Sequence, residues 1–171
     1  ALNSAQPLIG AAQRVTLLGS GAILTEVIKA AQQLAAQGVG VEVLSITSWS
    51  ELARDGMALE RLSDGAQAVG VGLGSAGAIA GDGDGAVSDP CSGHLATLLS
   101  ATQGPVIAAT DYVRAVPESV RAFVPEGRRY STLGTDGFGR SDTRAALRRF
   151  FAVDADSIAQ AALKALRALA A

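Results

Sequence analysis

The chain has 171 residues and a mass of 17.2 kDa, which suits one globular domain that needs neither disulfides nor metal to hold its core. Hydrophobic residues make up 49% of the sequence and charged residues 18%, a composition that excludes intrinsic disorder. The net charge of −2 excludes the basic footprint of a nucleic-acid-binding domain, and the single cysteine excludes an internal disulfide and fits a reducing compartment.

Two segments were weighed as targeting or membrane sequences. Residues 1–10 lack the basic stretch that opens a signal peptide, and the uncharged run 65–81 is shorter than the roughly 20 residues of a membrane helix and is rich in glycine. The chain also lacks an initiator methionine, which suggests processing or excision from something longer. We therefore expect a flexible lead at 1–13 and one soluble domain at 14–171.

Strand patterns and helix patterns alternate along the chain. Short aliphatic runs that end at glycine or polar residues predict strands at 14–18, 39–46, 104–110 and 129–133, with a weaker candidate at 68–73. Apolar residues at helical spacing predict helices at 22–36, 49–56, 113–123, 143–151 and 155–170. This order predicts an α/β fold, an open and mostly parallel sheet of about five strands with helices on both faces.

The segment 62–90 stands apart from this alternation. It is rich in glycine, which supplies no side chain for packing and loses the most backbone entropy on folding. Structureless segments of that length are uncommon within compact domains. We expect 62–90 to be a mobile insertion.

Three short motifs within the chain could carry chemistry, and each has a simpler structural interpretation. The turn Gly19-Ser20-Gly21 lacks the third glycine of a dinucleotide fingerprint, because Leu24 stands there. The Gly81–Gly85 run fits neither a calcium loop nor a diphosphate–Mg²⁺ motif, since the required downstream asparagine is missing. Cys91 and His94 are too few for a zinc site, and their spacing alone does not make a nucleophile pair, so we expect His94 at an exposed helix start.

The richest stretch follows the last strand, from Leu133 to Arg144. Glycines at 134, 137 and 139 allow sharp turns, and loops at the carboxyl ends of parallel strands are where ligands or partners bind. We expect Phe138 as a buried apolar plug and Asp136 paired with Arg140. We expect Ser141 or Asp142 to cap the next helix.

This stretch, Leu-Gly-Thr-Asp-Gly-Phe-Gly-Arg-Ser-Asp-Thr-Arg, resembles the C-terminal, transketolase-type domain of the homodimeric bacterial pyruvate dehydrogenase decarboxylating component. Three further stretches agree in order: Val-Thr-Leu-Leu-Gly-Ser-Gly at 15–21, Ser-Trp-Ser-Glu-Leu-Ala-Arg-Asp-Gly at 48–56, and Pro-Val-Ile-Ala-Ala-Thr-Asp-Tyr at 105–112. After Glu60-Arg61 the sequence departs from the family's tryptophan–asparagine and proline-rich continuation, which puts the contacts of that stretch in doubt.

The resemblance implies a role without chemistry for this chain. The family enzyme decarboxylates pyruvate with thiamine diphosphate and Mg²⁺ and acetylates a lipoyl group on dihydrolipoyl acetyltransferase, and its cofactor contacts lie in two preceding domains. By resemblance this domain braces the pyrimidine-binding domain and the homodimer interface of a cytoplasmic bacterial enzyme, and it is inactive alone. We expect no catalytic, cofactor-binding or metal-binding residue here. The expected interface or structural loop residues are Asp111, Tyr112, Asp136, Phe138, Arg140, Ser141 and Asp142.

Two other functions stay open at this point. A free-standing module could bind a nucleotide or another phosphate-bearing ligand at its glycine-rich strand-to-helix turns. A third interpretation is a domain that serves only self-association. The sequence leaves the roles of Cys91 and His94 and the choice of 2-oxo acid undecided.

Overall fold

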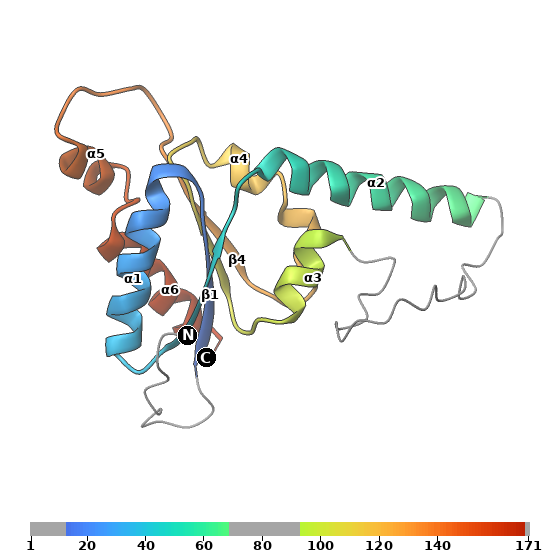
Figure 1. Cartoon of the computed structure of the whole chain (residues 1–171), viewed down its shortest axis with the longest axis horizontal. Helices are drawn as coiled ribbons and strands as arrows, with labels where there is room; N and C mark the ends of the chain where they lie inside the picture. The colour runs from blue at the N-terminus through green and yellow to red at the C-terminus, as the bar shows by residue number, and fades with distance from the viewer. Residues whose placement is uncertain (1–12, 69–92, 170–171) are drawn as a thin grey trace, which may run out of the picture.

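A parallel sheet of four strands forms the centre of the domain (Figure 1). The computed structural model describes residues 13–68 and 93–169. The strands lie in the order β2-β1-β3-β4, with bounds β1 Arg14–Gly19, β2 Gly40–Ser45, β3 Val106–Ala109 and β4 Tyr130–Leu133. The predicted open α/β sheet is confirmed, with four strands in the described ranges instead of about five. The weak candidate at 68–73 contributes no described strand, because Ala68 ends a helix and 69–73 lie outside the described residues.

The two inner strands are buried on both faces, which is why they read as continuous apolar runs. Leu17 and Leu18 are both inaccessible to solvent although successive side chains point to opposite faces, and every residue of β3 is buried. Helices must therefore cover the sheet on both sides. They divide into two groups that Figure 1 shows to the left and right of the strands.

The first group covers one face with α1 (Leu24–Ala36), which follows the short turn η1 (Gly21–Ile23), and α6 (Ala155–Arg167). The predicted stripe on α1 is confirmed, since Ile23, Val27 and Leu34 are buried against the sheet. Ile158 and Leu166 of α6 belong to the same apolar cluster. The short α5 (Arg144–Phe150) lies on this side, beyond the carboxyl ends of the strands (Figure 1).

The second group covers the other face with α2 (Trp49–Ala68), α3 (His94–Ser100), α4 (Ala115–Glu118) and η2 (Arg121–Phe123). Their shared cluster includes Trp49, Leu95 and Val120. The single helix predicted at 113–123 is two short pieces. Pro117 lies inside α4, whose four residues form only one turn, so it breaks no long hydrogen-bonded ladder.

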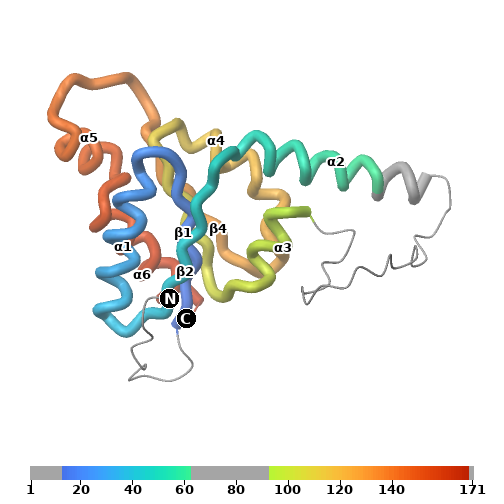
Figure 2. The backbone as a smooth tube through the Cα atoms, viewed as in Figure 1, coloured from blue at the N-terminus to red at the C-terminus, as the bar shows by residue number. Residues whose placement is uncertain are grey.

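The helix α2 is longer than the sequence indicates. Gly56 was expected to end it, yet the helix continues through Gly56 to Ala68, because the ring of Phe123 packs where a β-carbon at Gly56 would lie, at 2.3 Å. The expected cap is confirmed in part, since the Glu51 amide donates to the Ser48 hydroxyl at 3.3 Å. Figure 2 shows the helix leaving the body of the domain, and Leu62 near its end is 68% exposed. The start of the proposed 62–90 insertion is thus helical, while 69–90 and the lead 1–12 lie outside the described residues.

Arg128 ties together the segments that lead into the strands. Its guanidinium donates to the Gly104 carbonyl at 2.8 Å, the Leu99 carbonyl at 2.7 Å and the Thr16 hydroxyl at 3.0 Å, and Thr102 accepts as well. Burial lowers the pKa of this arginine from its ordinary value, although every acceptor is neutral. A charged group bonded this fully orders the amino edge of the sheet.

Gly104, at the same edge, has no space for a side chain. Its φ is +77°, and a β-carbon would lie 1.7 Å from the Arg14 carbonyl oxygen. Gly38 has a similar φ of +81° with nothing within 4 Å. The two glycines therefore separate backbone strain from collision.

We predict that Gly38→Ala lowers the free energy of unfolding by about 1–2 kcal/mol, the cost of left-handed backbone for an L-residue. Gly104→Ala should cost clearly more, because the Arg14 backbone must move as well. Urea denaturation of the two variants measures both effects. Equal losses would contradict the collision that the structure places at Gly104.

Candidate functional site

The carboxyl edge of the sheet is where an open parallel sheet offers a site. After β1 the chain passes to α1 on one face, whereas after the neighbouring strand β3 it passes to α4 on the other face. Such a change of direction leaves a crevice that ligands use. Here the Ser20 hydroxyl donates to the Thr110 hydroxyl at 2.8 Å, and both residues are buried. The protein's own side chains close the bottom of the crevice.

The loops after β3 and β4 are bound into one platform above that closure. The Thr135 amide donates to the Tyr112 carbonyl at 2.9 Å, and the Thr135 hydroxyl donates to the Asp111 carbonyl at 2.8 Å. Gly134 permits this approach, since a β-carbon there would lie 2.6 Å from the Tyr112 carbonyl oxygen. Side chains on the platform are therefore held by a backbone with little freedom.

Asp136 fastens the same two loops. Its carboxylate accepts a hydrogen bond from the Arg114 amide at 2.8 Å and another from the Arg114 guanidinium. These two hydrogen bonds, the amide first, hold the pKa of Asp136 below its ordinary value. The expected pairing of Asp136 with Arg140 is wrong, because Arg114 reaches the carboxylate from the adjacent loop.

The side chain of Phe138 corrects a second expectation. It was expected as a buried plug, yet its ring is 96% exposed. The hairpin of chain around it turns outward at Gly137, whose φ is +100°, and no apolar neighbour follows it. Tyr112 and Val113, on the platform, are also exposed, at 61% and 46%.

A third correction concerns the cap of α5. Ser141 and Asp142 were the expected caps, but the Thr143 hydroxyl accepts from the Ala146 amide at 3.3 Å and so caps the helix. Asp142 supports that cap, since its carboxylate accepts from the Thr143 amide at 2.6 Å. Ser141 is exposed beside them.

The helix α5 is anchored to the domain through a buried carboxylate. Glu26, 7% exposed, accepts from Arg148 at 2.8 Å and from Lys29 at 2.9 Å, and its other oxygen accepts from the Ala155 amide at 3.2 Å. Burial alone raises the pKa of this group. The hydrogen bond from Lys29, the Ala155 amide and the two positive charges outweigh burial and hold the pKa of Glu26 below its ordinary value.

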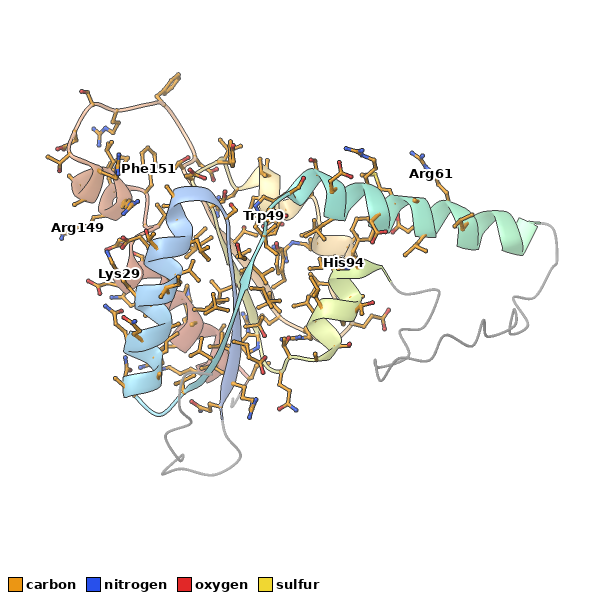
Figure 3. The ribbon with its side chains drawn as sticks, viewed as in Figure 1. Lys29, Trp49, Arg61, His94, Arg149 and Phe151 are labelled. Atoms are coloured by element: carbon orange, nitrogen blue, oxygen red, sulfur yellow. The ribbon has the colours of Figure 1, made fainter. Side chains whose placement is uncertain are left out.

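A groove lies between the platform, the loop 137–140 and α5. Its volume is about 340 Å³. Its apolar lining includes Ile23, Leu147, Phe151 and Val153, while Asp111, Arg140 and Arg144 supply charge. Figure 3 shows Phe151 between α5 and α1 and Arg149 on the outer side of α5.

Sequence reasoning missed the partners in these contacts. Arg114 lies 22 residues before Asp136, and Arg148 lies 122 residues after Glu26, so neither spacing marks a pair. A signal for the first pair exists only in the topology. Since β3 and β4 are parallel neighbours, the loops that follow them must meet.

The other sequence motifs add no chemistry to this edge. His94 begins α3 and is exposed, as expected, and its amide donates to the Asp55 carboxylate at 2.7 Å. Cys91 and the Gly81–Gly85 run lie outside the described residues. Nothing supports the nucleotide-binding alternative at Gly19–Gly21, where the Ser20 hydroxyl is committed to Thr110.

The described residues do not fit a thiamine diphosphate–Mg²⁺ site. Between residues 13 and 68 and between 93 and 169 there is no group of three His, Cys, Asp or Glu side chains that could hold a metal ion. Asp111 is the one acid lining the groove, and three arginines line it as well. In the same ranges no helix combines the length and apolar character needed to cross a membrane.

Fold and sequence comparisons define the class of this protein. The family model of the transketolase-like TK C-terminal domain matches residues 2–154. The chain belongs to this family. The pyruvate dehydrogenase E1 component of Cupriavidus necator is 46% identical to it over 156 residues, that of Pseudomonas aeruginosa 42% over 160, and that of Escherichia coli K12 40% over 155.

These alignments cover 90–91% of this chain but only 15–16% of each relative. The chain thus corresponds to a small C-terminal part of a much longer enzyme component. A solved structure described as a split gene transketolase, inactive beta4 tetramer, superposes with a TM-score of 0.53 at 18% identity, over 92% of this chain and 40% of that one. That likeness confirms the transketolase-type fold.

The buried Glu26 predicts an acid-sensitive stability. A carboxylate with a lowered folded-state pKa stabilises the fold above its unfolded value of about 4.5 and loses that contribution as pH falls through the folded-state pKa. Glu26→Gln should therefore unfold more easily at pH 7, by about 1–3 kcal/mol, and lose less of its remaining stability below pH 4.5.

The matched control for this variant is Glu51→Gln. Glu51 forms an ion pair with Arg54 on α2, but its side chain is 62% exposed. Its replacement should change unfolding little. Urea midpoints measured at pH 7 and pH 3.5 give both comparisons, and an equal acid response of wild type and Glu26→Gln would contradict the role of Glu26.

The exposed ring of Phe138 predicts tolerance to truncation. Phe138→Ala should change the free energy of unfolding of this chain by less than about 0.5 kcal/mol, as a surface substitution does. Thermal melting by circular dichroism measures it. A loss of several kcal/mol, the cost of emptying a core position, would show that the ring is buried after all.

Proposed function

We propose that this chain is the C-terminal structural and dimerisation domain of a thiamine-diphosphate-dependent pyruvate dehydrogenase component of the acetyl-transferring type. The identity of 40–46% to pyruvate dehydrogenase E1 components supports this function and carries most of the proposal. The enzyme decarboxylates pyruvate and passes the acetyl group to a lipoyl group of dihydrolipoyl acetyltransferase. As in the family it resembles, it acts as a homodimer in the bacterial cytoplasm.

The geometry of the carboxyl edge favours a role in assembly. The crevice is closed by Ser20 and Thr110, and the loops above it are stiffened by hydrogen bonds. A stiff surface that exposes Tyr112 and Phe138 binds a protein partner at a low cost in entropy. We propose that thiamine diphosphate and Mg²⁺ bind in the preceding domains and that this domain braces the pyrimidine-binding domain.

The loop residues have different parts in that bracing. Asp136 acts within the domain, since it fastens the two loops. Asp111 and Arg140 line the groove, and Tyr112 and Phe138 face outward to contact the rest of the enzyme. Ser141 and Asp142 set the start of α5, which carries the groove's outer wall.

We predict that the 171-residue chain shows no turnover when mixed with pyruvate, thiamine diphosphate, Mg²⁺ and an artificial electron acceptor. The Cupriavidus necator enzyme with its matching C-terminal region replaced by this chain should reduce the acceptor, and the same enzyme without that region should not. Reduction by the isolated chain would contradict the proposal, and so would an inactive chimera.

A further inference from the structure

Aromatic and aliphatic side chains gather on the carboxyl edge without cover. Phe138 is 96% exposed, Phe150 on α5 58%, and Tyr112 and Val113 on the platform 61% and 46%. We call these four residues, together with Arg140 and Arg144, the carboxyl-edge face. Contiguous exposed apolar side chains of this kind mark interaction surfaces.

The charge on this face is positive although the chain as a whole carries −2. The Arg140 guanidinium stacks 4.0 Å from the centre of the Phe150 ring. In the part of the chain that the structure describes, Arg144 and Arg149 have no carboxylate partner, whereas the nearby Arg148 is bound to Glu26. Asp136 is occupied by Arg114, so it does not neutralise the face.

The position of Arg144 is unfavourable for the helix that contains it. Arg144 is the first residue of α5, and no acidic residue lies in the first turn. The amino end of a helix dipole is positive, so a cation there costs stability and an anion would add it. The stability of α5 therefore does not explain Arg144, and an anionic partner would.

The groove beside these arginines has room for an apolar side chain. Leu147, Phe151 and Val153 provide an apolar lining, and Arg140 and Arg144 lie among its charged lining residues. An apolar site with guanidinium groups nearby suits a segment that carries an apolar side chain next to carboxylates, because guanidinium groups bind carboxylates through two parallel hydrogen bonds.

A second copy of this domain fits the face poorly. A symmetric dimer sets the same patch against itself, and here it would place Arg140 and Arg144 of one copy against those of the other. The remaining source is the enzyme's own preceding chain. The matched region is only 15–16% of the relatives' length, so most of such an enzyme lies outside this chain.

We propose that the carboxyl-edge face docks an acidic surface of the preceding domains, with an apolar side chain in the groove and carboxylates on Arg140 and Arg144. This inference rests on the proposed function and names the chemistry of the surface that the domain braces. It assigns Phe138 and Arg144 to contacts between domains.

The test uses the Cupriavidus necator chimera that carries this chain, with Arg144→Glu and Phe138→Ser introduced separately. Each variant should lower acceptor reduction at least about fivefold at low salt, as expected for a central interface residue. The isolated chain with the same substitutions should keep its melting temperature, since both side chains are exposed and a glutamate at position 144 suits the helix.

The matched control is Arg61→Glu, a charge reversal of the same kind on the distant helix α2, where Figure 3 shows Arg61 pointing away from the domain. It should leave the activity of the chimera unchanged. Full activity of both face variants would overturn this inference while leaving the proposed function intact. An isolated chain that dimerises in sedimentation, and loses the dimer on Phe138→Ser, would overturn it in favour of a second copy. An inactive unsubstituted chimera would contradict the proposed function and this inference with it.

Discussion

The hydrogen bond between the Ser20 and Thr110 hydroxyls closes the point at which a sheet of this topology offers a ligand crevice. β1 and β3 diverge to helices on opposite faces there, and in many α/β proteins a cofactor fills the space between them. With the crevice closed, the loops beyond it pack on each other through Asp136 and Thr135 instead of on a ligand. Their side chains then point outward, and the edge becomes a surface for protein contacts.

Much of the fold could be predicted because the buried sheet imposes a strong pattern. Strands covered on both faces must be apolar at every position, and the helices that cover them must be apolar on one side. Leu17, Leu18 and the stripe of α1 follow these rules. The rule failed at Gly56, where glycine ends many helices, but here it admits the Phe123 ring from another element.

The candidate site was predicted by location and not by contact. Glycine spacing and family resemblance both directed attention to the loop after β4, which does line the groove. Phe138 was misplaced because an isolated aromatic carries no periodic pattern that tells core from interface. The partners of Asp136 and Glu26 come from Arg114 and Arg148, whose proximity depends on strand order and helix packing.

The account's central claim is that the chemistry of the enzyme lies outside this chain. Isothermal titration calorimetry of the folded 171-residue chain with thiamine diphosphate and Mg²⁺ tests it most directly. The account predicts no saturable heat of binding at millimolar cofactor. Stoichiometric binding of one cofactor per chain would contradict it.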